Sequence, residues 1–222
     1  MPFIGPQPSA RNKGRPRGFD RDQALIQALD VFWRKGYEPA SINELCAAMG
    51  INPPSLYAAF GNKAKLFLEA VDYYERTYWD ATWTRMAEQV EIGRAIDDFF
   101  REAAGILLSP LAPCGCLVVL AAVNVSPDSA EVSEAVAALR LEGRQLFAAR
   151  LKLAVSQGQL PLDTDIQSLA AALNTMLEGM SLQARDGFTP LAMTRLAAHA
   201  VRLLPLGNGE HCSLDDSKTY EP

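Results

Sequence analysis

Two cysteines one residue apart, Cys114 and Cys116, are the side chains best suited to covalent chemistry in this sequence. A thiol in the first turn of a helix has a lowered pKa and reacts readily with oxidants and electrophiles. Because Cys116 follows Pro113 at an expected helix start, one interpretation is a redox or electrophile sensor. The other is a buried, small apolar side chain.

The remaining reactive residues do not form a recognisable metal or enzyme site. The Cys-Gly-Cys spacing is shorter than the Cys-x₂₋₄-Cys pairs that bind zinc, and the chain has only two histidines, His199 and His211. The sequence shows no Ser-His-Asp set and no phosphate-binding loop. We therefore expect no metal, no cofactor and no catalytic residue.

A second group of side chains, between residues 41 and 63, can donate hydrogen bonds to phosphates and base edges. It comprises Ser41, Asn52, Ser55, Tyr57 and Lys63. The surrounding charge suits a polyanion. Residues 1–68 hold nine Lys or Arg and five Asp or Glu, a net charge of +4, whereas residues 69–222 hold twelve and twenty-one, a net charge of −9. The total of −5 therefore describes a basic N-terminal part on an acidic body.

Helices must position these side chains. Asp20 with Gln23, and Ser41 with Glu44, have the spacing of capping boxes. The two helices that they start are expected to end at Gly36 and Gly50. Asn52, followed by Pro53 and Pro54, predicts a third helix over residues 53–60. The tight turn at Gly50-Ile51 makes the second and third helices a helix-turn-helix, whose third helix enters the major groove.

The rest of the chain also has helical periodicity. Asn62 is expected to cap a long fourth helix that runs to about residue 88, and further helices are expected near 93–108, 115–125, 128–157, 164–186 and 189–203. We predict an all-α protein in four parts. These are a flexible basic arm (1–18), a helix-turn-helix domain (19–66), a larger helical domain (67–204) and a disordered tail (205–222).

The composition fits a folded cytoplasmic protein with reduced thiols. Apolar residues make up 49% of the chain and charged residues 21%, and four cysteines are too few for a disulfide framework. The N-terminus lacks an apolar run of signal-peptide length. Residues 103–127 carry no formal charge, but Pro110 and Pro113 interrupt them. Because proline inside a helix costs about 3 kcal/mol, we expect no membrane span.

The segment GYEPASINELCAAMGINPPSLYAAFGNKAKLFLEAV, residues 36–71, resembles the DNA-binding head of the tetracycline-repressor (TetR) family of bacterial regulators. More weakly, Gly115-Cys116-Leu117, and Gly158-Gln159-Leu160 followed by Asp165, are similar to effector domains of the AcrR-like branch. The resemblance implies a two-domain, all-helical repressor. Such a protein binds near-palindromic operator DNA as a homodimer and is usually released by a small molecule.

The resemblance also implies roles for individual residues. Ser41 caps the second helix and can donate to a phosphate, and Tyr57 and Lys63 contact the DNA backbone. Asn52, Pro54 and Ser55 are candidates for base edges. The alternatives are core packing for Tyr57 and a solvated charge for Lys63. The family often has a basic residue and glycine where this chain has Pro53 and Pro54, so specificity must shift to neighbouring residues.

The arm Lys13-Gly14-Arg15-Pro16-Arg17 is similar to segments that lie in narrow A·T-rich minor grooves. Arg15 and Arg17 would enter the groove. The alternative is a disordered basic arm that adds only nonspecific attraction.

The larger domain offers a candidate effector pocket and a candidate dimer surface. Aromatic pairs at i,i+4 give the fourth helix two aromatic faces, of which one can line a pocket and one can pack in the core. The candidate lining residues are Tyr74, Tyr78, Trp79, Trp83, Phe99, Phe100, Cys116, Leu117, Leu120, Asn124, Phe147 and Met176. The Ala- and Leu-rich helices 164–186 and 189–203 are expected to form the homodimer's four-helix bundle. The alternatives to a ligand-released repressor are a cysteine sensor on the same scaffold and a DNA-binding protein without an effector.

Overall fold

The computed structural model describes residues 19–110 and 112–206, and within these ranges it contains helices and no strand. The all-α prediction is therefore confirmed for these residues. Arg15 and Arg17 of the arm, and residues 207–222 of the tail, lie outside the described residues. No helix in the described part is long and apolar enough to cross a membrane. The α-helices are α1 (Arg21–Lys35), α2 (Ile42–Met49), α3 (Pro53–Phe60), α4 (Lys63–Tyr74), α5 (Asp80–Glu88), α6 (Ile92–Leu107), α7 (Leu117–Leu120), α8 (Ala130–Ser156), α9 (Ile166–Arg185) and α10 (Pro190–Ala197), with a π-helical turn at Glu75–Trp79 and 3₁₀ turns at Pro127–Ser129 and Ala200–Leu203.

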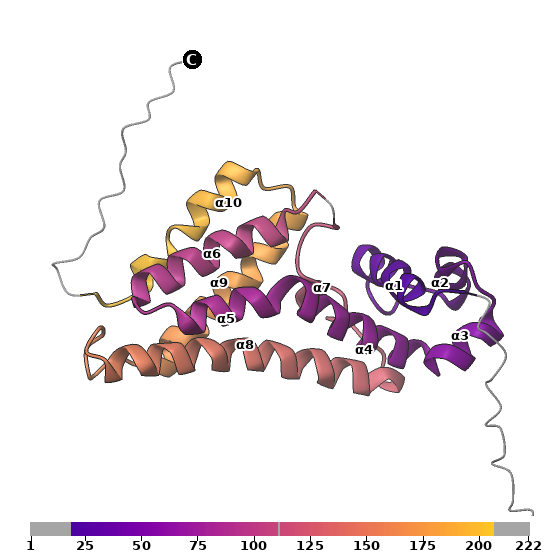
Figure 1. The fold of residues 1–222 in the computed structure, drawn as a ribbon, viewed down its shortest axis with the longest axis horizontal. Coiled ribbons are helices and arrows are strands. Elements are labelled where there is room, and N and C mark those ends of the chain that lie inside the picture. The colour runs from indigo at the N-terminus through magenta and orange to yellow at the C-terminus, as the bar shows by residue number, and fades with distance from the viewer. Residues whose placement is uncertain (1–18, 111, 207–222) are drawn as a thin grey trace, which may run out of the picture.

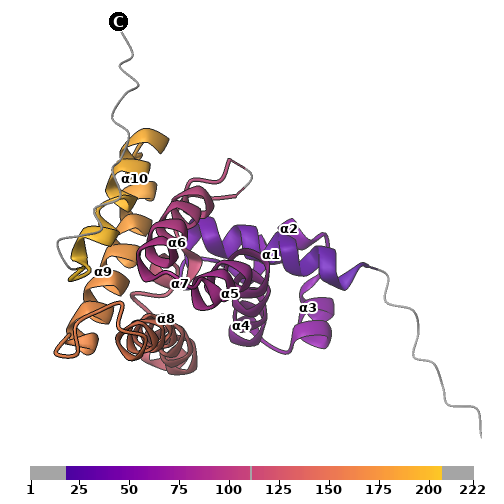
Figure 2. The same ribbon diagram turned by 60° about the vertical axis from the view of Figure 1, so that its left-hand side comes forward.

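The molecule has a small head, formed by α1 to α3 and the start of α4, and a larger body. Figure 1 shows the head at one end, with α4 and α5 running from it into the body and α8 lying along them. In both views α9 and α10 lie on the side of the body away from α3 (Figures 1 and 2). The connection between head and body is therefore a helix that belongs to both.

Capping residues start the head helices where the sequence predicts. The Asp20 carboxylate accepts from the backbone N–H groups of Asp22 and Gln23 at 3.0 and 3.1 Å. Ser41 and Glu44 form a reciprocal capping box. Gly50 ends α2 in the left-handed region, with φ 65°, which favours glycine. The turn between α2 and α3 is thus specified by local chemistry.

The long fourth helix differs from the prediction at its middle. Its backbone stays helical from Lys63 to Glu88, but the turn Glu75–Trp79 is π-helical. The N–H of Asp80 donates to the carbonyl of Glu75, five residues earlier. This wider turn brings Tyr74 and Trp79, also five residues apart, to one buried side, where the Trp79 Nε1 donates to the Tyr74 hydroxyl at 2.7 Å. A regular α-helix would separate these two side chains by about 140° around its axis.

The helix expected over 115–125 is largely wrong. Only Leu117–Leu120 is α-helical, and bends follow it. The Ala121 carbonyl, which would bond residue 125 in a continued helix, accepts instead from the Tyr37 N–H of the head at 2.6 Å. A contact with a distant residue therefore ends α7 early.

Candidate nucleic-acid interface and cavity

Helix α3 exposes Pro54, Tyr57 and Ala58 and half-buries Ser55. Its large apolar residues, Leu56 and Phe60, are buried in the head. Tyr57 is 48% exposed, so it is not a core residue. Pro54 is exposed at the start of the helix. The structure therefore places Asn52, Pro54, Ser55 and Tyr57 at one accessible helix, with Ser41 and Lys63 on neighbouring helices.

Asn52 and Ser41 are both used as helix caps. The Asn52 Oδ1 accepts from the backbone N–H of Ser55 at 2.9 Å, which leaves its amide N–H groups facing outward to donate. The Ser41 hydroxyl accepts from the Glu44 N–H at 3.2 Å and lies 3.1 Å from the Glu44 carboxylate, to which it donates. A phosphate would have to compete with Glu44 for the Ser41 proton.

Lys63 contacts the head itself. Its Nζ donates to the Glu38 carbonyl at 3.0 Å and lies 4.5 Å from the centroid of the Tyr37 ring. Partial burial lowers the pKa of the ammonium. Lys63 is therefore more than a solvated surface charge: it ties the start of α4 to the loop between α1 and α2.

An ion pair that the sequence reading missed fixes the other end of α3. Arg21 and Glu69 form two charge-assisted hydrogen bonds, of 2.5 and 2.7 Å, between α1 and α4. The Arg21 guanidinium also lies 4.4 Å from the centroid of the Phe60 ring. Because 48 residues separate the two charges, no local pattern could have paired them.

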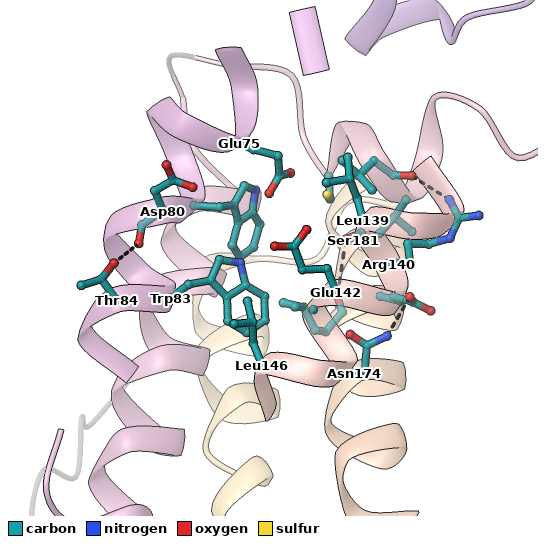
Figure 3. A pocket seen from close by; sticks show the side chains of 17 residues that line it. Glu75, Asp80, Trp83, Thr84, Leu139, Arg140, Glu142, Leu146, Asn174 and Ser181 are labelled. Carbon is teal, nitrogen blue, oxygen red and sulfur yellow. Dashed lines mark hydrogen bonds between the residues drawn. The ribbon is translucent and has the colours of Figure 1, made fainter. Parts of the chain in front are cut away.

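The body contains a cavity of about 310 Å³ between the π-helical turn with α5, the α7 segment, α8 and α9 (Figure 3). Its lining combines apolar and acidic side chains. The residues are Glu75, Trp79, Asp80, Trp83, Thr84, Cys116, Val118, Val119, Leu139, Arg140, Glu142, Gly143, Leu146, Asn174, Leu177, Glu178 and Ser181. The volume is within the usual range of small-molecule sites, about 300–1,000 Å³.

Of the predicted pocket residues, only Trp79, Trp83 and Cys116 lie on this lining. The others belong to the core or to the surface elsewhere. Five are fully or almost fully buried core residues: Tyr74, Phe99, Phe100, Leu117 and Phe147. Tyr78 packs against Trp33, with ring centroids 5.3 Å apart. Leu120 and Met176 are half-buried outside the lining, and Asn124 is exposed. The other aromatic residues therefore mainly form the core beneath the cavity, where Phe99 packs against Trp83 with ring centroids 4.4 Å apart.

The acidic side chains of the lining were missed. Figure 3 shows the carboxylates of Glu75 and Glu142 pointing into the same space from different elements. Burial, together with the negative charges of Asp80 and Glu142, raises the pKa of Glu75 to about 8. One signal was available: Glu75, Trp79 and Trp83 follow each other at i,i+4 spacing, which places an acid on the aromatic stripe.

Cys116 does not have the environment that the sensor interpretation requires. Its side chain is buried, and burial, with the negative charge of Glu75, raises the pKa of the thiol to about 11. The lowered pKa of that interpretation is therefore wrong, and the alternative of a buried, small apolar side chain fits the structure. Cys116 precedes the first turn of a helix only four residues long, whose backbone N–H groups do not offset the loss of solvation. Cys114 is exposed.

Residues 115–121 contact both the cavity and the head. On the cavity side, the Val118 carbonyl accepts from the Arg140 guanidinium at 3.0 Å. On the head side, the Gly115 carbonyl accepts from the buried Trp33 Nε1 at 2.9 Å. We call residues 115–121 the bridging segment. It was not identified from sequence because its partner in the head, Trp33, lies 82 residues from Gly115.

Helix α9 has an exposed face of small residues. Five exposed residues recur along the helix, and the spacing between them alternates between four and three residues: Ser168, Ala172, Thr175, Gly179 and Leu182. A side chain at Gly179 would meet nothing within 4 Å in the single chain. Leu191 of α10 is 62% exposed. This spacing is that of helices that pack closely against a partner helix.

Comparison with known families agrees with this geometry. The family model described as bacterial regulatory proteins, tetR family, matches residues 25–70, and the one described as tetracyclin repressor-like, C-terminal domain, matches residues 94–200. The first match covers the helix-turn-helix. The second covers α8 and α9, and most of the residues around the cavity.

Individual relatives match along most of their length. The HTH-type transcriptional repressor ComR of Escherichia coli K12 is 32% identical over 196 residues, which are 88% of this chain and 93% of ComR. BdcR of the same organism, also a transcriptional repressor, is 28% identical over 86% of this chain and 92% of its own.

Solved structures give the same result. A cysteine-substituted form of the regulator CifR, complexed with 26-bp double-strand operator DNA, is 40% identical with a TM-score of 0.83 and covers 86% of this chain and 100% of CifR. A second CifR structure with operator DNA has a TM-score of 0.81 at 40% identity, over 85% of this chain and 98% of that one. The chain therefore belongs to the TetR family of bacterial transcriptional regulators.

Proposed function

We propose that this protein is a repressor that binds near-palindromic operator DNA as a homodimer and releases it when a small molecule occupies the cavity of the body. The observation that carries the proposal is the exposed face of α3, which presents Tyr57, on a head whose fold matches an operator-bound relative. The repressor ComR and the operator complexes of CifR support the same role.

The head supplies both phosphate and base contacts. Tyr57 presents a hydroxyl for a phosphate, and the Asn52 amide, Ser55 and the apolar face of Pro54 lie at the start of α3, which is the end that meets base edges in this motif. Lys63 and Ser41 lie on the same head and are further candidate phosphate contacts. Arg15 and Arg17 would add minor-groove contacts.

The exposed face of α9, together with α10, is the proposed dimer surface. A four-helix bundle built from two copies of these helices would bury Ala172, Thr175 and Gly179 at close approach. Both helices lie away from α3 (Figure 2). The dimer would therefore leave both heads free to meet half-sites separated by one helical turn, about 34–36 Å.

Two connections can transmit the effect of ligand binding from the cavity to the head. The first is α4, which continues through the π-helical turn into the cavity wall at Glu75 and Trp79. The second is the bridging segment. A ligand that shifts either one would tilt the head and change the half-site spacing. A coupling free energy of about 1–3 kcal/mol would weaken operator binding roughly 5–150-fold.

Selection of genomic DNA fragments on the purified protein tests the proposal. We expect enrichment of one near-palindromic sequence that the wild type binds in a salt-dependent manner. The double variant Asn52→Ala/Tyr57→Phe should fold, since loss of the Asn52 cap costs only about 0.5–2 kcal/mol, but it should select no sequence. Equal enrichment by the wild type and this variant would show that α3 does not read DNA.

A further inference from the structure

The charges on the cavity lining are strongly unbalanced. Four carboxylates line it, from Glu75, Asp80, Glu142 and Glu178, against one cation, Arg140. The Arg140 guanidinium donates to the Val118 carbonyl. Among the described residues, neither Glu75 nor Glu142 forms an ion pair or a hydrogen bond through its carboxylate. The cavity therefore holds more negative charge than its own side chains neutralise.

The carboxylates come from separate elements that converge on one space. Glu75 extends from the π-helical turn and Glu142 from α8, and Figure 3 shows them facing one another across the cavity. Placing two acids together costs free energy, because the negative charge of Glu142 opposes ionisation of the partly desolvated Glu75. A positive charge between them would reverse this cost.

The remaining walls are aromatic and aliphatic. Trp79 and Trp83 form one wall, with ring centroids 6.5 Å apart, and Leu139 and Leu146 of α8 lie on the lining with them. Indole faces attract cations, with about 0.5–2 kcal/mol per contact depending on desolvation. The cavity thus combines the two features that recognise an organic cation: unpaired carboxylates and tryptophan faces.

A metal ion does not suit this arrangement. In the described part of the chain no three His, Cys, Asp or Glu side chains lie close enough together to hold a metal. The acids are spread around a space of about 310 Å³ rather than gathered at one point. The geometry favours an organic molecule that carries its positive charge on a bulky apolar body.

We propose that the cavity binds an organic cation with an aromatic or branched apolar body, whose charge lies between Glu75 and Glu142 and whose apolar part packs against Trp79 and Trp83. This inference rests on the proposed function, because it names the chemical class of the molecule that releases the operator. It excludes organic anions, which Asp80, Glu142 and Glu178 repel.

The test compares benzyltrimethylammonium with neopentylbenzene, its uncharged isostere, using quenching of tryptophan fluorescence to follow binding. We expect the cation to bind the wild type at least tenfold more tightly than the neutral compound. In the variant Glu75→Gln/Glu142→Gln the preference should fall to less than threefold. The matched control is Glu134→Gln, an exposed acid on the same helix as Glu142, which should keep the full preference.

A second measurement counts the protons that are released when the cation binds. Since Glu75 is largely protonated near neutral pH in the empty cavity, binding of a permanent cation should release close to one proton at pH 7. Titration calorimetry in buffers of different ionisation enthalpy measures this number. Glu75→Gln should release none. Because the substitution replaces a largely protonated carboxyl group with an uncharged amide of the same size, we expect it to leave the fold intact.

The outcomes separate this inference from the proposed function. Equal binding of cation and isostere, or binding of neither, by a preparation that still binds operator DNA would overturn the cation site alone. Preferential binding of the cation without loss of operator affinity would support the site and contradict effector release. Operator binding measured without any ligand tests the DNA-binding role independently.

Discussion

The buried indole Nε1 of Trp33, in the head, donates a hydrogen bond of 2.9 Å to the carbonyl of Gly115, in the bridging segment. The next residue, Cys116, lines the cavity of the body. The Trp33 ring also packs on Tyr74, with centroids 4.7 Å apart, just before the π-helical turn. One side chain of the head therefore contacts both connections to the cavity.

Replacing Trp33 with phenylalanine should weaken the coupling between cavity and head. Trp33→Phe keeps an aromatic ring but removes the donor to Gly115, whose buried carbonyl then lacks a partner, at a cost of about 1–3 kcal/mol. We expect operator affinity to persist while release by benzyltrimethylammonium falls at least threefold. Fluorescence anisotropy of labelled operator measures both. Unchanged release in a variant with lowered thermal stability would mean that the hydrogen bond is purely structural.

Removing the hydroxyl of Tyr57 should weaken DNA binding without loss of stability. The side chain is 48% exposed, and its oxygen forms no hydrogen bond within the described residues. A lost hydrogen bond to a charged phosphate is worth about 1.5–3 kcal/mol, so Tyr57→Phe should lower operator affinity by roughly ten- to 100-fold. Tyr73→Phe, a half-buried tyrosine of α4, is the matched control. Equal affinities of the two variants would remove Tyr57 from the interface.

Substitution of Gly179 by a charged residue should dissociate the dimer. The position is open in the single chain, and a helical Gly-to-Glu change favours the helix by several tenths of a kcal/mol, so the monomer fold should survive. Across a two-fold axis the two new carboxylates would face each other. We expect Gly179→Glu to be monomeric in sedimentation analysis and to bind DNA weakly. Ala149→Glu, on the exposed face of α8, should remain dimeric. A dimeric Gly179→Glu protein would place the interface elsewhere.

Titration of Glu75 should make the folded protein less stable as pH rises. Burial, together with the negative charges of Asp80 and Glu142, raises the pKa of Glu75 to about 8. The Cys116 thiol, Tyr74 and Arg140 also lie near Glu75. An unfolded Glu has a pKa of about 4.3, so between these values the native state holds a proton that the unfolded state has lost. This contribution is complete below the lower value and is lost as pH rises through 8.

The matched variant for this pH dependence is Glu75→Gln, which cannot titrate. Relative to it, the wild type should lose up to about 1.4 kcal/mol of unfolding free energy per pH unit between pH 5 and 8. Urea denaturation at one fixed protein concentration measures the difference. A difference that stays constant over this range would show that Glu75 ionises normally.

Local chemistry explains which elements were predictable. Asp20, Ser41 and Asn52 each cap a helix through a backbone N–H two or three residues away, so their spacing alone located α1, α2 and α3. The accessible face of α3 followed from the same periodicity. Tyr57, expected to contact the DNA backbone, is exposed, whereas Phe60, three residues later, is buried.

The cavity depended on non-local packing. The π-helical turn changes which residues of the fourth helix share a face, and it forms because Tyr74 and Trp79 are both buried. Glu75, the first residue of this turn, then lines the cavity. Likewise the hydrogen bond between the Tyr37 N–H and the Ala121 carbonyl shortened α7, and no sequence pattern near residue 121 predicts this bond.

Hydroxyl-radical footprinting of the selected operator tests the central claim most directly. A homodimer with two reading heads should protect two patches on one face of the duplex, about 34–36 Å apart, and benzyltrimethylammonium should remove both together. A single protected patch, continuous protection along the fragment, or protection that persists in Asn52→Ala/Tyr57→Phe would contradict the account.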